Sequence, residues 1–190
     1  MTKLNIAARC AVSISVAFVA ISAQASFHLW KFSEVFSNAD GSVQFIEMLD
    51  QFDGEEFVGG QQLMSNTGTF TVPTNLPSAV TANHRMLFAT AGFGALAGGV
   101  TPDYVIPAQF FNSAGDTLKW AGGFDIQTFG AIPTNGVTSR SLPGSGTGTN
   151  SPANFANQSG SVNLAVPEPA TFVLLVIAAA GWCLRRSRAA

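Results

Sequence analysis

Apolar and polar residues alternate along two stretches near the start of the chain. Residues 27–36 place apolar side chains on both faces of an extended strand, and residues 42–49 do the same. Between them, the segment Asn38-Ala39-Asp40-Gly41 is typical of a turn, because Gly41 can adopt a positive φ angle. The pattern therefore predicts a β-hairpin.

Further stretches have the apolar and β-branched character of short strands. They are 57–58 with 61–64, 69–72, 85–91, 117–121 and 124–129, and 161–165 is a candidate for the last strand. The stretch 85–91 is almost continuously apolar, as in a central strand, although periodicity alone does not distinguish it from a short buried helix. Gly122-Gly123 is expected to join the last two full strands in a turn.

Two segments lack a strand pattern. Residues 92–107 are rich in glycine and proline, which predicts irregular structure. In 141–160, fifteen of the twenty residues are Gly, Ser, Pro, Thr or Asn, which predicts a mobile low-complexity loop. No convincing helix is expected between 26 and 165. Many short strands around one core indicate an all-β body, a sandwich or a barrel, over residues 26–165.

The first 25 residues have the pattern of a secretory signal peptide. Lys3 and Arg9 provide the positive n-region, and 11–21 is an apolar stretch interrupted by two serines. Ala23-Gln24-Ala25 is a small-x-small cleavage site, so Ser26 is the expected mature N-terminus. The alternative is an uncleaved N-terminal anchor.

The last 25 residues, 166–190, end in an apolar stretch and a basic tail. Residues 170–184 are apolar on every face, which suits lipid. Fifteen residues span roughly 22 Å as a helix, against about 30 Å of hydrocarbon, so the predicted transmembrane helix is short. The tail 185–190 holds Arg185, Arg186 and Arg188, which predict a cytoplasmic end and a body outside the membrane.

Charge and cysteine content restrict the partners of the body. Residues 26–165 carry four basic and ten acidic side chains, a net charge of −6, which disfavours nucleic acid and anionic lipid. The two cysteines, Cys10 and Cys183, lie in the terminal segments. A body without cysteine must be stabilised by its hydrophobic core rather than by disulfides.

The residues that precede the apolar stretch resemble a known sorting signal. Val166-Pro167-Glu168-Pro169, an apolar stretch and terminal arginines are similar in order and position to the PEP-CTERM signal of Gram-negative bacteria. The resemblance implies recognition and processing near Pro-Glu-Pro by a membrane-embedded exosortase. It also implies export through the secretion machinery, an intermediate anchored in the inner membrane, and a final location in the envelope or outside the cell, often beside exopolysaccharide. The alternative is a plain C-terminal anchor.

A second resemblance concerns the body. Residues 43–48, Val-Gln-Phe-Ile-Glu-Met, look like the Phe-Ile-Glu-Leu strand of lamin-tail-like domains, and residues 86–89 look like a later apolar strand of those domains. The resemblance implies an immunoglobulin-like β-sandwich. The sequence departs from the pattern at Asp50, near where lamin-tail domains usually carry Asn.

Few residues of the body offer chemistry. His28 and His84 are isolated and more typical of structural roles than of catalysis, and no Gly-x-Ser-x-Gly motif is present. The loop 50–56 carries the calcium candidates Asp50, Asp53 and Glu55, with Glu56 beside them, but a solvated acidic turn is the favoured explanation of the loop. No cofactor is expected.

Aromatic side chains are either a core or a sugar-stacking surface. They are Trp30, Phe32, Phe45, Phe88, Phe110, Phe111 and Trp120. The sequence therefore predicts an exported, non-enzymatic envelope or matrix protein. A carbohydrate- or calcium-binding extracellular module is the alternative, and a small hydrolase is the least favoured.

Overall fold

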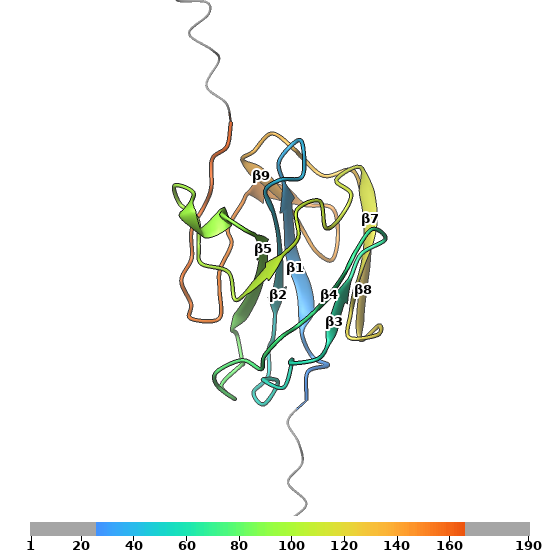
Figure 1. The fold of residues 1–190 in the computed structure, drawn as a ribbon, viewed down its shortest axis with the longest axis vertical. Coiled ribbons are helices and arrows are strands. Elements are labelled where there is room, and N and C mark those ends of the chain that lie inside the picture. The colour runs from blue at the N-terminus through green and yellow to red at the C-terminus, as the bar shows by residue number, and fades with distance from the viewer. Residues whose placement is uncertain (1–25, 166–190) are drawn as a thin grey trace, which may run out of the picture.

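The computed structural model of the chain describes residues 26–165 (Figure 1). The expected signal peptide, with Ala23 and Ala25, and the expected signal 166–190 lie outside the described residues, whereas Ser26 is the first residue inside them. The described part contains strands and one 3-10 helix. Their bounds are β1 Lys31–Ser37, β2 Gln44–Leu49, β3 Gln62–Met64, β4 Thr69–Thr71, β5 Arg85–Thr90, η1 Phe93–Ala95, β6 Tyr104–Ile106, β7 Gly115–Trp120, β8 Asp125–Gly130, β9 Thr138–Ser141 and β10 Thr147–Thr149.

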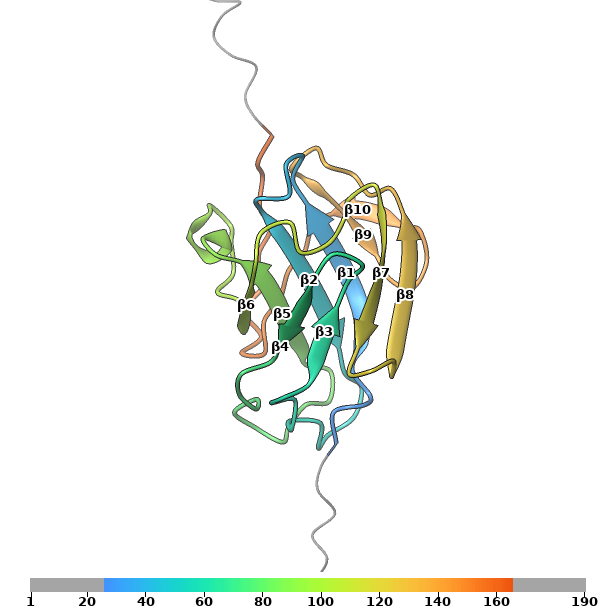
Figure 2. The same cartoon turned by 45° about the vertical axis from the view of Figure 1, so that its right-hand side comes forward.

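The strands form two sheets that face each other, which confirms the expected all-β fold with a sandwich arrangement (Figure 2). One sheet has six strands in the order β10-β9-β1-β2-β5-β6, and the other has four in the order β4-β3-β7-β8. The hairpin β1–β2 forms as predicted, and so does the β7–β8 hairpin. Among the strands of residues 26–165, only β6 pairs in parallel, with β5.

The main core fills the space between the sheets. Alternate residues of β2 and β5 point toward the other sheet; they are Ile46, Met48, Met86 and Phe88. They form one cluster with Leu63, Leu118, Trp120 and Phe129 of that sheet. The stretch 85–91 therefore contains a strand rather than a helix, and this strand is β5, Arg85–Thr90. The aromatic residues singled out from the sequence are all buried, which assigns them to the cores.

The six-stranded sheet is also covered on its outer face. Phe45, Leu87 and Ala89 point away from the other sheet and form a second cluster with Phe36, Phe93, Val100 and Val162. The cover consists of the segment around η1 and of residues that follow β10. Burial on both faces explains why β5 is apolar at almost every position.

Three sequence predictions about the later part of the chain were wrong. The expected irregular segment 92–107 contains η1 and β6. The expected mobile loop 141–160 contains the end of β9, all of β10 and a buried stretch that includes Ala153, Asn154 and Phe155. The candidate strand 161–165 is not a strand, because the N–H of Val162 donates to the side chain of Asn150 instead of to a sheet neighbour.

The glycines of this later part are required where two backbones meet. A Cβ atom on Gly160 would lie 2.2 Å from the carbonyl oxygen of Gly98, and one on Gly98 would lie 2.0 Å from that of Ser161. Only hydrogen at these positions lets residues 159–161 lie against the segment after η1. Low-complexity composition here reflects close packing rather than disorder.

We therefore predict that Gly160→Ala lowers the free energy of unfolding by about 2 kcal/mol, because the added methyl group must displace backbone. Gly148→Ala is the matched control, since no heavy atom lies within 4 Å of the Cβ that it adds. We expect that control to stay within about 0.5 kcal/mol of the parent protein. Urea denaturation followed by tryptophan fluorescence measures both, and equal effects would contradict the prediction.

Within residues 26–165 we find no helix that is long and apolar enough to span a membrane. The expected transmembrane helix 170–184 lies beyond that range.

Candidate functional site

The expected sorting signal follows directly on a segment that the structure does describe. We call residues 150–165 the C-terminal strap; it runs along the outer side of the six-stranded sheet and leaves the body at the end opposite to Ser26 (Figure 1). Its contacts decide how firmly the body is connected to the residues that follow. The strap is therefore the part of the candidate site that can be built from its residues.

Buried carboxylates of the sheet hold the start of the strap. The N–H and hydroxyl groups of Ser151 donate to the two carboxylate oxygens of Glu34 on β1, at 2.9 and 2.8 Å. Two residues later, the N–H of Ala153 donates to Glu47 on β2 at 2.8 Å. Both glutamates belong to the outer face of the sheet, where the alternation of the strands turns them toward the strap.

A third carboxylate continues the same pattern. The N–H of Phe155 donates to Asp103, at 3.0 Å to the nearer oxygen, and Asp103 also accepts the N–H of Leu87 at 2.8 Å. Every second N–H from 151 to 155 is therefore bound by a carboxylate, as in an extended strand that pairs with side chains instead of with backbone. His84 adds a contact between its Nδ1 and the carbonyl of Phe155, at 2.8 Å.

Glu47 is the central residue of this arrangement. It is fully buried, forms an ion pair with Arg85, and accepts the hydroxyl of Ser33 at 2.7 Å. Burial raises the pKa of its carboxyl group, and the Ser33 hydrogen bond and the Arg85 charge only partly oppose that rise. Burial raises the pKa of Asp103 in the same way.

These shifts predict how stability depends on pH. The folded protein binds a proton at Glu47, Asp50 and Asp103 more tightly than the unfolded chain does, because burial raises each pKa. Their contribution to stability is complete below the ordinary pKa values and is lost as the pH rises through the raised ones. We expect a higher melting temperature at about pH 4, near the ordinary pKa values, than at about pH 7. Thermal melts across this range check the result, and Glu47→Gln should flatten the profile.

The end of the strap is held at the loop before β9. The side-chain amide of Asn150 donates to the carbonyl of Val162 at 2.7 Å, and its Oδ1 accepts the N–H of Val162 at 2.8 Å. The N–H of Leu164 donates to the carbonyl of Gly136 at 2.8 Å. The body is thus fixed as far as Leu164, one residue before the described range ends.

The calcium candidates do not come together. Asp50 is buried and accepts the N–H of Phe52, whereas Asp53 is exposed and accepts the N–H of Ala82. Glu55 is buried and accepts the N–H of Leu29. Among residues 26–165, no three His, Cys, Asp or Glu side chains gather as metal ligands would. Asp50, Asp53 and Glu55 of the loop 50–56 each accept a backbone N–H, and Asp50 and Glu55 are buried, so the loop is not a freely solvated turn.

The two histidines make different contacts. His28 contacts the hydroxyl of Ser26 and lies 3.8 Å from Glu55, but both contacts involve its Nδ1 atom. A catalytic triad needs the nucleophile and the acid on different ring nitrogens. His84 packs on the ring of Phe155 with centroids 4.8 Å apart and is part of the strap contact.

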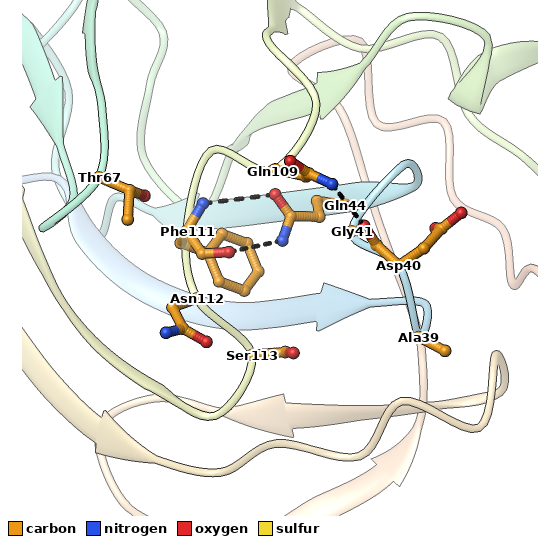
Figure 3. Close-up of a pocket in the computed structure, with 9 residues that line it drawn as sticks. All are labelled: Ala39, Asp40, Gly41, Gln44, Thr67, Gln109, Phe111, Asn112 and Ser113. Atoms are coloured by element: carbon orange, nitrogen blue, oxygen red, sulfur yellow. Dashed lines mark hydrogen bonds between the residues drawn. The ribbon is translucent and has the colours of Figure 1, made fainter.

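A polar hollow lies beside the turn between β1 and β2 (Figure 3). It has a volume of about 360 Å³ and is lined by polar side chains that include Asp40, Gln44 and Asn112. Gln44 is fixed to the backbone of Phe111, donating at 2.8 Å, and Gln109 donates to the carbonyl of Asp40 at 3.0 Å. The sequence placed Asp40 in a turn and Phe111 among the aromatic residues, but it did not predict a hollow here.

The sequence reasoning also missed Glu34, Glu47 and Asp103 as binding groups. A signal was present for Glu47, which stands among apolar residues in Phe45-Ile46-Glu47-Met48. A carboxylate in such a strand is buried only when a partner binds it. That partner is the strap, which lies more than a hundred residues further along the chain and has no strand pattern of its own.

Comparison with known proteins identifies the end of the chain. A family model described as the PEP-CTERM protein-sorting motif matches residues 165–188. The match confirms the resemblance of the sequence to PEP-CTERM proteins, and it includes Val166–Pro169, Arg185, Arg186 and Arg188. No curated protein and no solved structure matches the chain. The motif implies an exosortase as processing partner, export, and transient anchoring in the membrane.

Proposed function

We propose that this chain, which carries a PEP-CTERM protein-sorting motif, is a non-enzymatic protein of the cell envelope or extracellular matrix of a Gram-negative bacterium. A signal peptide, residues 1–25, directs it to the secretion machinery, and the transmembrane helix 170–184 holds it in the inner membrane. An exosortase then processes it near Val166–Pro169. The observation that carries the proposal is the sorting motif at residues 165–188.

The strap supports the proposal, because it connects the motif to a body that is folded up to its last residues. Processing beyond Ala165 would leave Glu34, Glu47 and Asp103 with their partners and the second core cluster complete. Removal of the signal therefore keeps all of these contacts within residues 26–165. A protein whose core depended on the signal would unfold on processing.

The experiment is the intact mass of the protein recovered from the native envelope and from the medium. We expect a mass that begins at Ser26 and ends near Pro-Glu-Pro, with any excess identifying an attached group. A mass that still includes Trp182 and the terminal arginines would make the signal a permanent anchor and would refute processing.

The proposed fold type is immunoglobulin-like, close to lamin-tail domains. Support comes from the two segments that carry the resemblance, 43–48 and 86–89. They lie on the adjacent strands β2 and β5, with Ile46 opposite Phe88 and Met48 opposite Met86. An experimental structure that superimposes on a lamin-tail domain with these two strands in register would test it.

A carbohydrate-binding module is the second candidate, and the polar hollow of Figure 3 favours it. Carboxylate and amide groups such as those of Asp40 and Asn112 are suited to sugar hydroxyls. Phe111 is only 2% exposed, however, so it offers no stacking face. Calorimetry with exopolysaccharide purified from the producing organism tests this candidate, with Asn112→Ala as the matched variant. The absence of binding heat with the parent protein would remove the candidate.

A further inference from the structure

The distance between the folded body and the expected membrane span is short. Ala165 is the last described residue, and Leu164 before it is fixed to Gly136. From Ala165 to the expected start of the span at Ala170, the chain reaches at most about 18 Å when fully extended. The headgroup layer takes up about 6 Å of that reach. An enzyme that cuts between these residues must therefore lie against the end of the body from which the strap leaves.

That end is formed by two loops and the end of the strap. The turn between β1 and β2, residues 38–42, lies at the end where the strap leaves (Figure 1). Asn38 pairs with Asn135 of the loop before β9. Residues of the two loops and Leu164 line a hollow of about 470 Å³, and the polar hollow of Figure 3 shares Ala39 and Asp40 with it.

The geometry points to this end of the sandwich, centred on the turn 38–42, as the surface that contacts the extracytoplasmic part of the membrane-embedded processing enzyme. The inference rests on the proposed function. The lining of both hollows contains amide and hydroxyl groups and a single charge, Asp40. Such a surface fits polar protein loops better than anionic lipid, which is bound through lysine and arginine.

The turn is also rigid enough to serve as a contact surface. Asp40 accepts the N–H of Ser42 at 2.9 Å, and Gly41, with a φ angle of 71°, allows the chain to reverse. The carbonyl of Gly41 accepts the N–H of Gln109 at 2.8 Å, which ties the turn to the segment before β7. A fixed turn loses little conformational entropy when a partner binds.

The test compares two exposed aspartates at opposite ends of the body. Asp40 and Asp53 each accept one backbone N–H, and Asp40 also accepts the hydroxyl of Ser42 at 2.6 Å, so Asp40→Lys and Asp53→Lys are compared as the same change of charge. Full-length protein is followed in the producing cells by pulse-chase, and the rate of conversion to the processed form is measured. We expect Asp40→Lys to slow conversion about five-fold and Asp53→Lys to leave it unchanged. Melting temperatures of the two variants control for folding.

Ala39→Lys is a second variant, because the side chain of Ala39 is exposed and replacing it removes no side-chain hydrogen bond. Insertion of a flexible linker of about twelve residues between Ala165 and Val166 should restore the rate of Asp40→Lys, since the body would no longer be held against the enzyme. Conversion of both Asp40→Lys and Ala39→Lys at the parental rate would overturn the inference.

A photo-cross-linking residue at position 39 identifies the partner. An adduct with the processing enzyme supports the inference, and adducts with lipid alone overturn it in favour of a membrane-contact surface. Failure of the parent protein to be processed at all would instead refute the proposed function. The two failures are therefore distinguishable.

Discussion

Replacing Trp120 with alanine is expected to lower the free energy of unfolding by about 4 kcal/mol. Trp120 ends β7, is 0% exposed, and lies in the cluster between the two sheets. Its ring packs near Phe88 of the opposite sheet with centroids 6.0 Å apart, and its Nε1–H donates to the carbonyl of Phe27 at 2.8 Å. Alanine would leave a large cavity and an unpaired carbonyl.

Two controls separate these contributions to the effect of Trp120→Ala. Trp120→Phe retains most of the apolar volume but loses the hydrogen bond, so we expect a loss of about 2 kcal/mol. Ile126→Ala on the neighbouring strand β8 removes a side chain that is 51% exposed, and we expect less than about 1 kcal/mol. Urea denaturation measures all three variants. An effect of Trp120→Ala no larger than that of Ile126→Ala would show that the two sheets do not share a core here.

The second large effect is expected for Glu47→Ala, about 3 kcal/mol of lost stability. Burial of the carboxylate opposes ionisation, as its raised pKa indicates, but the group binds three partners. They are Arg85, the hydroxyl of Ser33 and the N–H of Ala153. Alanine leaves the N–H of Ala153 buried without an acceptor, whereas Arg85, with 39% of its side chain exposed, can rehydrate.

The variant also has a local consequence in the strap. Hydrogen exchange at Ala153 should accelerate in Glu47→Ala by more than the global loss of stability accounts for, because that N–H loses its acceptor. Glu47→Gln retains a carbonyl acceptor and should lose about half as much stability. Unchanged exchange at Ala153 in Glu47→Ala would mean that the strap is held by its apolar contacts alone.

Much of the body was predictable because its strands carry local signals. The hairpin β1–β2 has alternating strands around a turn that needs Gly41, and β7–β8 has a glycine turn. The strand β5 was predicted from an apolar stretch, although burial on both faces removed the alternation that distinguishes strand from helix. Local propensity and side-chain period are enough in such cases, since the partner strand is the next one in sequence or the apolar stretch is short.

The candidate site was predictable only in its terminal motif. The PEP-CTERM signal is recognised from consecutive residues, so the order of these residues along the chain is enough to identify it. The strap is the opposite case. Its composition predicts a mobile loop, yet Asn150, Ala153 and Phe155 are buried. Glycine, serine and asparagine have little strand propensity, so the order of this segment comes from partners that are distant in sequence.

The sequence by itself determined that the body is all-β, that its core must be made of apolar and aromatic side chains, and that the chain ends in a sorting motif. These properties follow from side-chain period, composition and a contiguous motif. Only the tertiary structure decided that Glu34, Glu47 and Asp103 bind the N–H groups of the strap, and that the turn 38–42 lies where the chain leaves the body. These hydrogen bonds join residues 52 to 117 positions apart, so they depend on how the sheets stack, and no local pattern encodes that stacking.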